Sequence, residues 1–243
     1  MRHKILFDSS SVYGKGFKFG ANVVVGTNVK LGINVTLGNN VIIYPKTRIG
    51  DTVVIMDNAV IGKPVLLGKN SSRKKPLVGI LDIKNNVSIG TNSVIYGGSI
   101  IEANVYIADM VNIRENCKIG KNSTIGKMVS VEFNVTVGKN SKILDCSQIT
   151  EFTKIGNNVF IGPDVSLCVD PYFGRVKEGD KKIVIRDYAM IGGNATIGPG
   201  VVVGKNSLVA VGAVVVNNVP AKKVVFGNPA KVVWNVDSMM VKV

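Results

Sequence analysis

The chain has 243 residues, of which 30 are basic and 16 acidic, and its net charge is +14. Hydrophobic residues make up 46% of the sequence but aromatic residues only 6%, so aliphatic side chains, mostly the strand-favouring Val and Ile, must build the core. No apolar run approaches the ~18 residues of a membrane span, and the N-terminus holds too short an apolar stretch for a signal peptide. The positive charge suits an anionic partner such as nucleic acid, a membrane surface or a phosphorylated small molecule.

From Phe19 onward, a large apolar residue recurs at every sixth position. This six-residue repeat runs from Phe19 to Ile61, from Ile83 to Leu167 and from Ile185 to Val215, and it covers 29 hexads. Position two is often Gly, position five is often Val, Ala, Ser or Thr, and position four is Asn in 16 of the 29. Because Asn and Gly tolerate positive φ, each hexad predicts a short strand and a sharp turn, with its first and fifth side chains pointing inward.

A strict period of six excludes the common alternatives. An amphipathic helix needs a period near 3.6, and a sandwich spaces its strands by 8–12 residues. Three hexads make one triangular coil, and nine to ten stacked coils would give a prism roughly 45 Å long at about 4.8 Å per coil. The sequence therefore predicts an all-β solenoid around one aliphatic column.

Two segments interrupt the six-residue repeat. The first, KPVLLGKNSSRKKPLVGILD at 63–82, carries Arg73, Lys74 and Lys75, and it is either a basic decoration or a flap near a nucleotide or a subunit contact. The second, at 168–184, is either an active-site loop or a plain surface excursion, since loops longer than ~12 residues are often functional.

Charged residues stand in the repeat between the two interruptions. Each alone is expected to be solvated at an outward corner, but together they offer carboxylates for an ammonium and a guanidinium for a diphosphate. These residues are Glu102, Asp109, Arg114, Glu115 and Glu132. The three cysteines, Cys117, Cys146 and Cys168, have no metal-site or disulfide spacing, so we expect packed thiols in a reducing, cytoplasmic setting.

The [LIV]-G-x-N-[VAST]-x repeat resembles that of the hexapeptide-repeat, left-handed parallel β-helix proteins over most of the chain. The left hand is implied by this resemblance alone, because general crossover rules favour the opposite hand. The resemblance implies a β-helix acyltransferase domain at 1–220 and a C-terminal tail on the cofactor side at 221–243. Some relatives are carbonic anhydrases that hold zinc with three histidines, but this chain has only His3, so we expect no metal.

The segment Gly-Asn-Pro-Ala-Lys at 227–231 is similar to the closing segment of family acyltransferases. In those relatives an acyl-CoA lies along the final coils, between two subunits of a trimer. The resemblance implies that small residues let the pantetheine arm approach the backbone and that lysines pair with the phosphates. The residues are Gly192, Gly193, Ala195, Ala210, Ala213, Lys222, Lys223 and Lys231. Alternatively, the small residues fill tight corners and the lysines are solvated.

The second interruption is similar to the Thr-Asn-Asp-x-Tyr loop, often followed by Gly-Arg, of relatives that acylate amino groups on nucleotide-linked sugars. Asp170, Tyr172, Gly174 and Arg175 match that pattern, while Cys168 and Val169 replace its Thr and Asn. Family O-acyltransferases use a histidine general base, and no histidine lies in 4–243. An amine acceptor does not need such a base during attack, because it can lose its proton afterwards.

These features predict a homotrimeric N-acyltransferase that moves an acyl group from acetyl-CoA or a longer acyl-CoA to a dTDP- or UDP-linked amino sugar. Asp109 or Glu132 would orient the amine or take its proton. The acceptor would bind to Glu102, Arg114, Glu115, Asp170, Tyr172 and Arg175. The alternatives are O-acylation of a sugar or serine hydroxyl, and a non-catalytic basic binding module. We expect no membrane partner and no nucleic acid, because aromatic residues do not interleave with the lysines.

Overall fold

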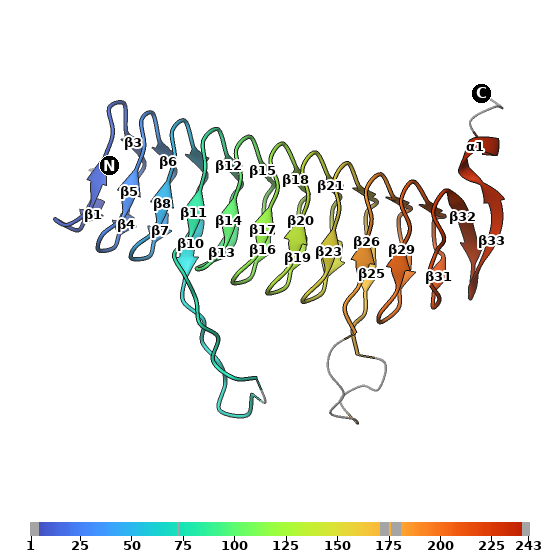
Figure 1. The fold of residues 1–243 in the computed structure, drawn as a ribbon. Helices are drawn as coiled ribbons and strands as arrows, with labels where there is room; N and C mark the ends of the chain where they lie inside the picture. The colour runs from blue at the N-terminus through green and yellow to red at the C-terminus, as the bar shows by residue number, and fades with distance from the viewer. Residues whose placement is uncertain (1–4, 72, 171–174, 176–180, 240–243) are drawn as a thin grey trace.

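In a computed structural model, which describes residues 5–71, 73–170, 175 and 181–239, the chain forms a parallel β-helix (Figure 1). The strands form three sheets, which we call sheets A, B and C, and every third strand joins the same sheet. The predicted all-β solenoid of hexapeptide coils is confirmed. Within the described residues, no helix has both the length and the apolar character needed to cross a membrane.

The strands are short, mostly two residues each, and from β1 to β31 they succeed one another in the order A, B, C, after which β32 and β33 both join sheet C. Sheet A contains β1 (Ile5–Phe7), β4 (Val23–Val25), β7 (Ile42–Ile43), β10 (Val60–Lys63), β13 (Val94–Tyr96), β16 (Asn112–Ile113), β19 (Ser130–Val131), β22 (Gln148–Ile149), β25 (Ser166–Leu167), β28 (Thr196–Ile197) and β31 (Val214–Val215). Sheet B contains β2 (Val12–Tyr13), β5 (Lys30–Leu31), β8 (Arg48–Ile49), β11 (Asp82–Ile83), β14 (Ile100–Ile101), β17 (Lys118–Ile119), β20 (Thr136–Val137), β23 (Lys154–Ile155), β26 (Val184–Ile185) and β29 (Val202–Val203). Sheet C contains β3 (Lys18–Phe19), β6 (Thr36–Leu37), β9 (Val54–Ile55), β12 (Ser88–Ile89), β15 (Tyr106–Ile107), β18 (Thr124–Ile125), β21 (Lys142–Ile143), β24 (Phe160–Ile161), β27 (Met190–Ile191), β30 (Leu208–Val209), β32 (Lys223–Gly227) and β33 (Ala230–Asn235). The helix α1 (Val236–Met239) follows β33.

The core is the column of position-one and position-five side chains. Strand pairing sets these residues in register from coil to coil, so that Ile83 lies opposite Ile101 and Ile101 opposite Ile119. All three side chains are buried, as are the other aliphatic residues of the column. The repeat of six is therefore the spacing at which one side chain per strand can enter a shared, dry interior.

The helix has more coils than the nine to ten predicted, because its sheets contain 11, 10 and 12 strands. The additional first coil extends the six-residue repeat toward the N-terminus with aromatic residues, because Phe7 and Tyr13 precede Phe19 at intervals of six. The Phe7 and Tyr13 ring centroids lie 5.3 Å apart, and Phe17 packs on Tyr13 at 5.0 Å. This ring cluster lies at the N-terminal end of the column, and the antiparallel β32–β33 hairpin follows the last coil.

Two ladders of polar side chains hold the corners. Asparagines at position four adopt φ near +56° and stack, so that Asn104 Nδ2 donates to Asn122 Oδ1 at 2.9 Å and Asn122 Nδ2 to Asn140 Oδ1 at 3.1 Å. At position three, an Asp or Asn oxygen accepts the backbone N–H of the coil before it, at 2.6–3.0 Å. The residues that do so are Asn39, Asp51, Asp57, Asn85, Asp109, Asp145, Asn157 and Asp187.

The cysteines differ from the prediction. Cys117 is buried in the column, but Cys146 and Cys168 are exposed. The prediction of three packed thiols is therefore wrong for two of them. Cys146 stands at a corner position with φ +60°, so its side chain points out of the helix.

We predict that Ile125→Ala lowers the free energy of unfolding by about 2–5 kcal/mol, because it leaves a cavity in a column that cannot collapse. Its neighbour Thr124 points outward on the same strand, so Thr124→Ala is the matched control and should change stability by less than about 1 kcal/mol. Urea unfolding followed by circular dichroism measures both. Equal losses in the two variants would contradict the assignment of the inward face.

Candidate functional site

Both interruptions leave the helix at the same corner, where strands of sheet A lead into strands of sheet B. The first excursion, residues 64–81, follows β10, and the second, residues 168–183, follows β25. Figure 1 shows both on the same side of the helix. Between them lie the corner residues 96–98, 114–117, 132–135 and 150–153, which we call the A–B edge.

The A–B edge departs from the corner pattern of the rest of the helix. The eight position-three caps named above lie at the other two corners, after strands of sheets B and C. On this edge, position two carries Tyr96, Arg114, Glu132 and Thr150 in successive coils, spaced by 18 residues. These four side chains lie in one row between the two excursions and make this edge the candidate site.

Glu115 lies at the centre of the edge, and its side chain is 0% exposed. One carboxylate oxygen, Oε1, accepts a hydrogen bond from Arg73 of the first excursion, and the other, Oε2, pairs with Arg114 Nε at 3.1 Å. Burial alone would raise the pKa of this carboxyl, but hydrogen bonds from its own backbone N–H, Arg73 and Arg114 outweigh burial. The pKa therefore lies below its ordinary value of 4.5, and Glu115 is ionised and fully paired.

Glu132 is the carboxylate that remains accessible. Its side chain is 33% exposed, its Oε2 lies 3.5 Å from Arg114 Nη1, and its Oε1 lies 3.5 Å from Ser130 Oγ. Arg114 is 23% exposed, and its guanidinium carbon lies 5.1 Å from the Tyr96 ring centroid. One loosely paired carboxylate and one guanidinium thus face outward together.

Orphaned polar atoms gather around this edge. Within the described part of the chain, three buried side-chain oxygens have no hydrogen-bond partner: Asn112 Oδ1, Thr150 Oγ1 and Thr153 Oγ1. Asn112 precedes Arg114 by two residues, and Thr150 lies one coil beyond Glu132. A buried orphan costs about 1–3 kcal/mol, so such a group is expected to meet a ligand or water.

Cys117 lies below the cluster but is unsuited to be a nucleophile. Its Sγ donates to the Glu132 carbonyl at 3.0 Å. Burial raises the pKa of this thiol to about 12, and the carboxylates of Glu115 and Glu132 act in the same direction. The thiolate form is therefore absent at neutral pH. No group of three or more His, Cys, Asp or Glu in the described ranges could hold a metal ion.

The structure brings Arg114, Glu115 and Glu132 together as the sequence suggested, but it separates two other predicted residues. Glu102 lies at the corner after sheet B, 3.6 Å from Lys118 Nζ. Asp109 lies at the corner after sheet C, where its Oδ1 accepts the Thr91 N–H at 2.8 Å. Within one chain, neither Glu102 nor Asp109 lies beside the group formed by Arg114, Glu115 and Glu132, because the three corners of a coil point in different directions.

The predicted residues of the second excursion lie partly outside the described residues. Asp170 and Arg175 are exposed, and Asp170 makes an interaction of its own. Tyr172 falls outside the described residues. The roles of all three remain predictions.

The small residues of the C-terminal coils serve coil packing. Ala195 and Ala213 are 0% exposed and point into the core, so their side chains pack inside the helix, and the approach of a cofactor to their backbone stays a prediction. A Cβ on Gly192 would lie 2.5 Å from Val211 N, and the next coil therefore requires this glycine. Gly193 and Ala210 lie at the same corner of neighbouring coils. Lys222 and Lys231 are exposed, and Lys223 Nζ donates to Asn235 Oδ1 at 2.6 Å.

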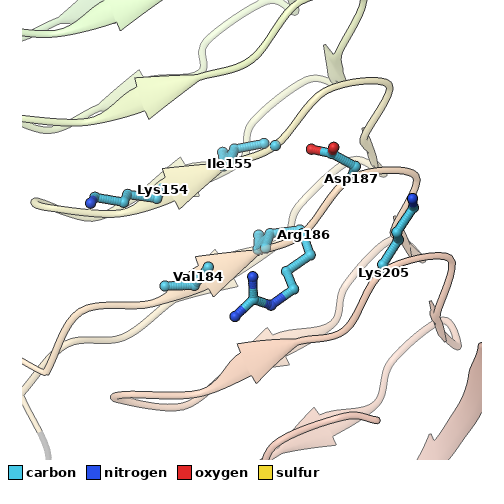
Figure 2. A pocket seen from close by; sticks show the side chains of 8 residues that line it. Lys154, Ile155, Val184, Arg186, Asp187 and Lys205 are labelled. Carbon is cyan, nitrogen blue, oxygen red and sulfur yellow. The ribbon is translucent and has the colours of Figure 1, made fainter. Parts of the chain in front are cut away.

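A basic pocket that the sequence analysis missed lies across sheet B near its C-terminal end. It has a volume of about 260 Å³ and is lined by Lys154, Ile155, Gly156, Val184, Ile185, Arg186, Asp187 and Lys205. Figure 2 shows Lys154, Arg186 and Lys205 spread around it on three successive coils. Asp187 is occupied, since its Oδ1 accepts the Asn157 N–H at 2.7 Å, and no ion pair among the described residues includes any of the three cations. The sequence contains no periodic signal for this pocket, because the three cations stand 32 and 19 residues apart and the second excursion separates the first two.

Comparisons with known proteins point to one repeat family. The profile described as the hexapeptide repeat of succinyl-transferase matches residues 14–45, 111–143 and 182–216. A UDP-3-O-acylglucosamine N-acyltransferase of Helicobacter pylori is 36% identical over 67 residues, which are 26% of this chain and 20% of that protein. The chain thus matches about a fifth of the length of that curated relative. The solved UDP-N-acetylglucosamine O-acyltransferase of Moraxella catarrhalis is 20% identical, with a TM-score of 0.52 over 98% of this chain and 75% of that one, and shares the fold.

The lowered pKa of Glu115 predicts a pH-dependent contribution to stability. Because the folded pKa lies below the unfolded one, the ionised carboxylate stabilises the fold at and above about pH 5, and this contribution is lost as pH falls through the folded value. We expect Glu115→Gln to lower the free energy of unfolding by about 3 kcal/mol at pH 7, with a shrinking difference from wild type below pH ~4. Urea unfolding from pH 3 to pH 8 measures this, and a difference that grows on acidification would contradict the pairing.

Proposed function

We propose that this chain, whose coils match the hexapeptide-repeat profile in three stretches, is a β-helix acyltransferase that transfers an acyl group from acyl-CoA to the amine of a dTDP- or UDP-linked amino sugar. The observation that carries the proposal is the A–B edge, where an accessible carboxylate stands beside a guanidinium between two excursions. The absence of histidine from residues 4–243 favours an amine over a hydroxyl acceptor, because a hydroxyl must lose its proton during attack.

The reaction assigns a role to each exposed group of the cluster. The neutral amine nitrogen, oriented by Glu132, attacks the thioester carbonyl, and Glu132 takes the proton that the nitrogen loses as the amide forms. The C–S bond breaks, and Glu132 passes this proton to the departing thiolate, so that coenzyme A leaves as a thiol. Arg114 directs Nε and Nη1 to carboxylates, and we assign its remaining Nη2 to a diphosphate oxygen. Asp170, Tyr172 and Arg175 would close on the sugar from the second excursion.

The basic pocket of sheet B supports a place for the cofactor. Lys222 follows one coil after Lys205, since Lys222 N donates to the Lys205 carbonyl at 2.9 Å. Arg186, Lys205 and Lys222 therefore form a basic column along the C-terminal coils, and we assign the phosphates of acyl-CoA to it.

A cofactor that lies along the outside of these coils has one face open, and a neighbouring subunit would cover that face. We therefore propose a homotrimer in the cytoplasm, with the tail at 221–243 on the cofactor side of the helix domain at 1–220.

The test of this function is incubation with acetyl-CoA and longer acyl-CoAs and a panel of dTDP- and UDP-linked amino sugars. Free CoA and the amide product are separated by chromatography, because the exposed Cys146 and Cys168 would react with a thiol reagent. Turnover on an amino sugar but not on its hydroxyl counterpart supports the proposal. Turnover on the hydroxyl sugar alone would replace it with O-acylation, and no turnover or CoA binding would reject it.

We predict that Glu132→Gln lowers kcat on the amino sugar by roughly 10²-fold, because the amide side chain accepts no proton. The KM for acyl-CoA should stay unchanged. Asp109→Asn is the matched control, since an amide oxygen can still accept the Thr91 N–H and the residue lies at another corner. Steady-state kinetics of the two variants decide the matter, and a larger loss in Asp109→Asn would move the base to that corner.

The double variant Arg186→Ala/Lys205→Ala should raise the KM for acyl-CoA by about 10- to 100-fold while the acceptor KM changes less than twofold, because charge-assisted hydrogen bonds to phosphate are lost. The double variant Lys121→Ala/Lys139→Ala, at two exposed residues outside the pocket, controls for the change in net charge. Unchanged acyl-CoA kinetics in the double variant would contradict the cofactor assignment.

A further inference from the structure

Arg73, in the first excursion, makes contacts that the proposed reaction leaves unexplained. Its guanidinium hydrogen-bonds the buried Oε1 of Glu115, and its Cζ lies 3.4 Å from the ring centroid of Phe133. Arg73 and Glu115 are 42 residues apart in the sequence, and the Arg73 side chain is 23% exposed. A guanidinium that is stacked on an aromatic face and paired with a buried carboxylate is fixed in direction as well as in charge.

The A–B edge is shaped to receive the rest of this excursion. Gly97 N donates to the Lys63 carbonyl at 3.1 Å, and Asn116 Nδ2 donates to the Leu77 carbonyl at 3.2 Å. A Cβ on Gly97 would lie 3.1 Å from Val78 Cγ1, so a larger residue there would push the excursion outward. The excursion is therefore held at its base by backbone contacts and farther out by Arg73.

Arg73 is also the first link in a chain of charges that ends at the reacting group. Glu115 shares one oxygen with Arg73 and the other with Arg114 Nε at 3.1 Å, and Arg114 Nη1 lies 3.5 Å from Glu132 Oε2. Without Arg73, the Glu115 carboxylate keeps one partner and gains freedom to rotate. Arg114 and Glu132 then lose the fixed geometry that positions a substrate.

The same contacts extend toward the second excursion. Phe133 packs edge-on against Phe152 with centroids 5.3 Å apart, and Lys182 of the second excursion lies with its Nζ 5.5 Å from the Phe152 centroid. Each excursion thus places a cation on one ring of the same pair. The two excursions are joined through this pair across the coils that carry Arg114 and Glu132.

We infer that the first excursion is a strap held over the A–B edge by Arg73, and that Arg73 is a positioning residue that sets acceptor affinity through Glu115 and Arg114. The effect on acceptor affinity rests on the proposed function, whereas the closure of the strap does not. The neighbouring Lys74 is exposed and has no ion pair among the described contacts, so it provides a control of equal charge on the same segment.

The experiment compares wild type, Arg73→Gln, Arg73→Lys and Lys74→Ala in two assays. The first is cleavage of the folded protein by thermolysin, which attacks before apolar residues such as the exposed Leu66 and Leu77. Arg73→Gln should be cut within 64–81 about tenfold faster than wild type, Arg73→Lys at an intermediate rate, and Lys74→Ala at the wild-type rate. An Arg73→Gln cleavage rate equal to that of Lys74→Ala would overturn the strap, whether or not any acyl transfer is found.

The second assay is steady-state kinetics with the amino-sugar acceptor. Arg73→Gln should raise the acceptor KM about tenfold, leave the acyl-CoA KM within twofold, and move the acid limb of the pH profile to higher pH because Glu115 loses a partner. Faster cleavage with unchanged acceptor KM and pH profile would overturn the positioning role and leave a purely structural contact. Faster cleavage of Arg73→Gln in a protein that acylates no acceptor would reject the proposed function but not the strap.

Discussion

Backbone hydrogen bonding from coil to coil is the constraint on which the whole molecule depends. Most strands have only two or three residues, so no coil is stable alone, and its N–H and C=O groups must meet those of the coils on either side. This pairing requires the corners of successive coils to superimpose. The asparagine ladder, including Asn104, Asn122 and Asn140, and the caps such as Asp109 are the side chains that meet the requirement. Function is then confined to places where the corners need not match.

The A–B edge is such a place, because the two excursions break the column on both sides of it. Four corners lie between them, and Arg114, Glu115 and Glu132 occupy two of these corners, on successive coils. Burying Glu115 is stabilising only because two guanidiniums reach it, and one of them comes from an excursion. The strap and the site therefore depend on the same buried carboxylate.

The sequence predicted the solenoid and both excursions because a period of six, interrupted twice, leaves little choice of architecture. The sequence analysis missed the first coil, because the aromatic residues Phe7 and Tyr13 stand there at the repeat positions that aliphatic residues occupy elsewhere. Grouping Asp109 with Arg114 was avoidable, since within the uninterrupted repeat two residues share a corner only when their separation is close to zero or to a multiple of 18, as for Arg114 and Glu132, whereas Asp109 and Arg114 stand five apart. The contact of Arg73 with Glu115 could not be predicted in this way, because the path of an irregular excursion follows no period.

The most direct test of the account is a crystal structure of the protein with a bound dTDP- or UDP-linked amino sugar. The account predicts that the diphosphate lies within hydrogen-bond distance of Arg114 and that the amine lies beside Glu132, between the two excursions. A nucleotide sugar bound away from the A–B edge, for example in the pocket formed by Arg186 and Lys205, would contradict the central claim.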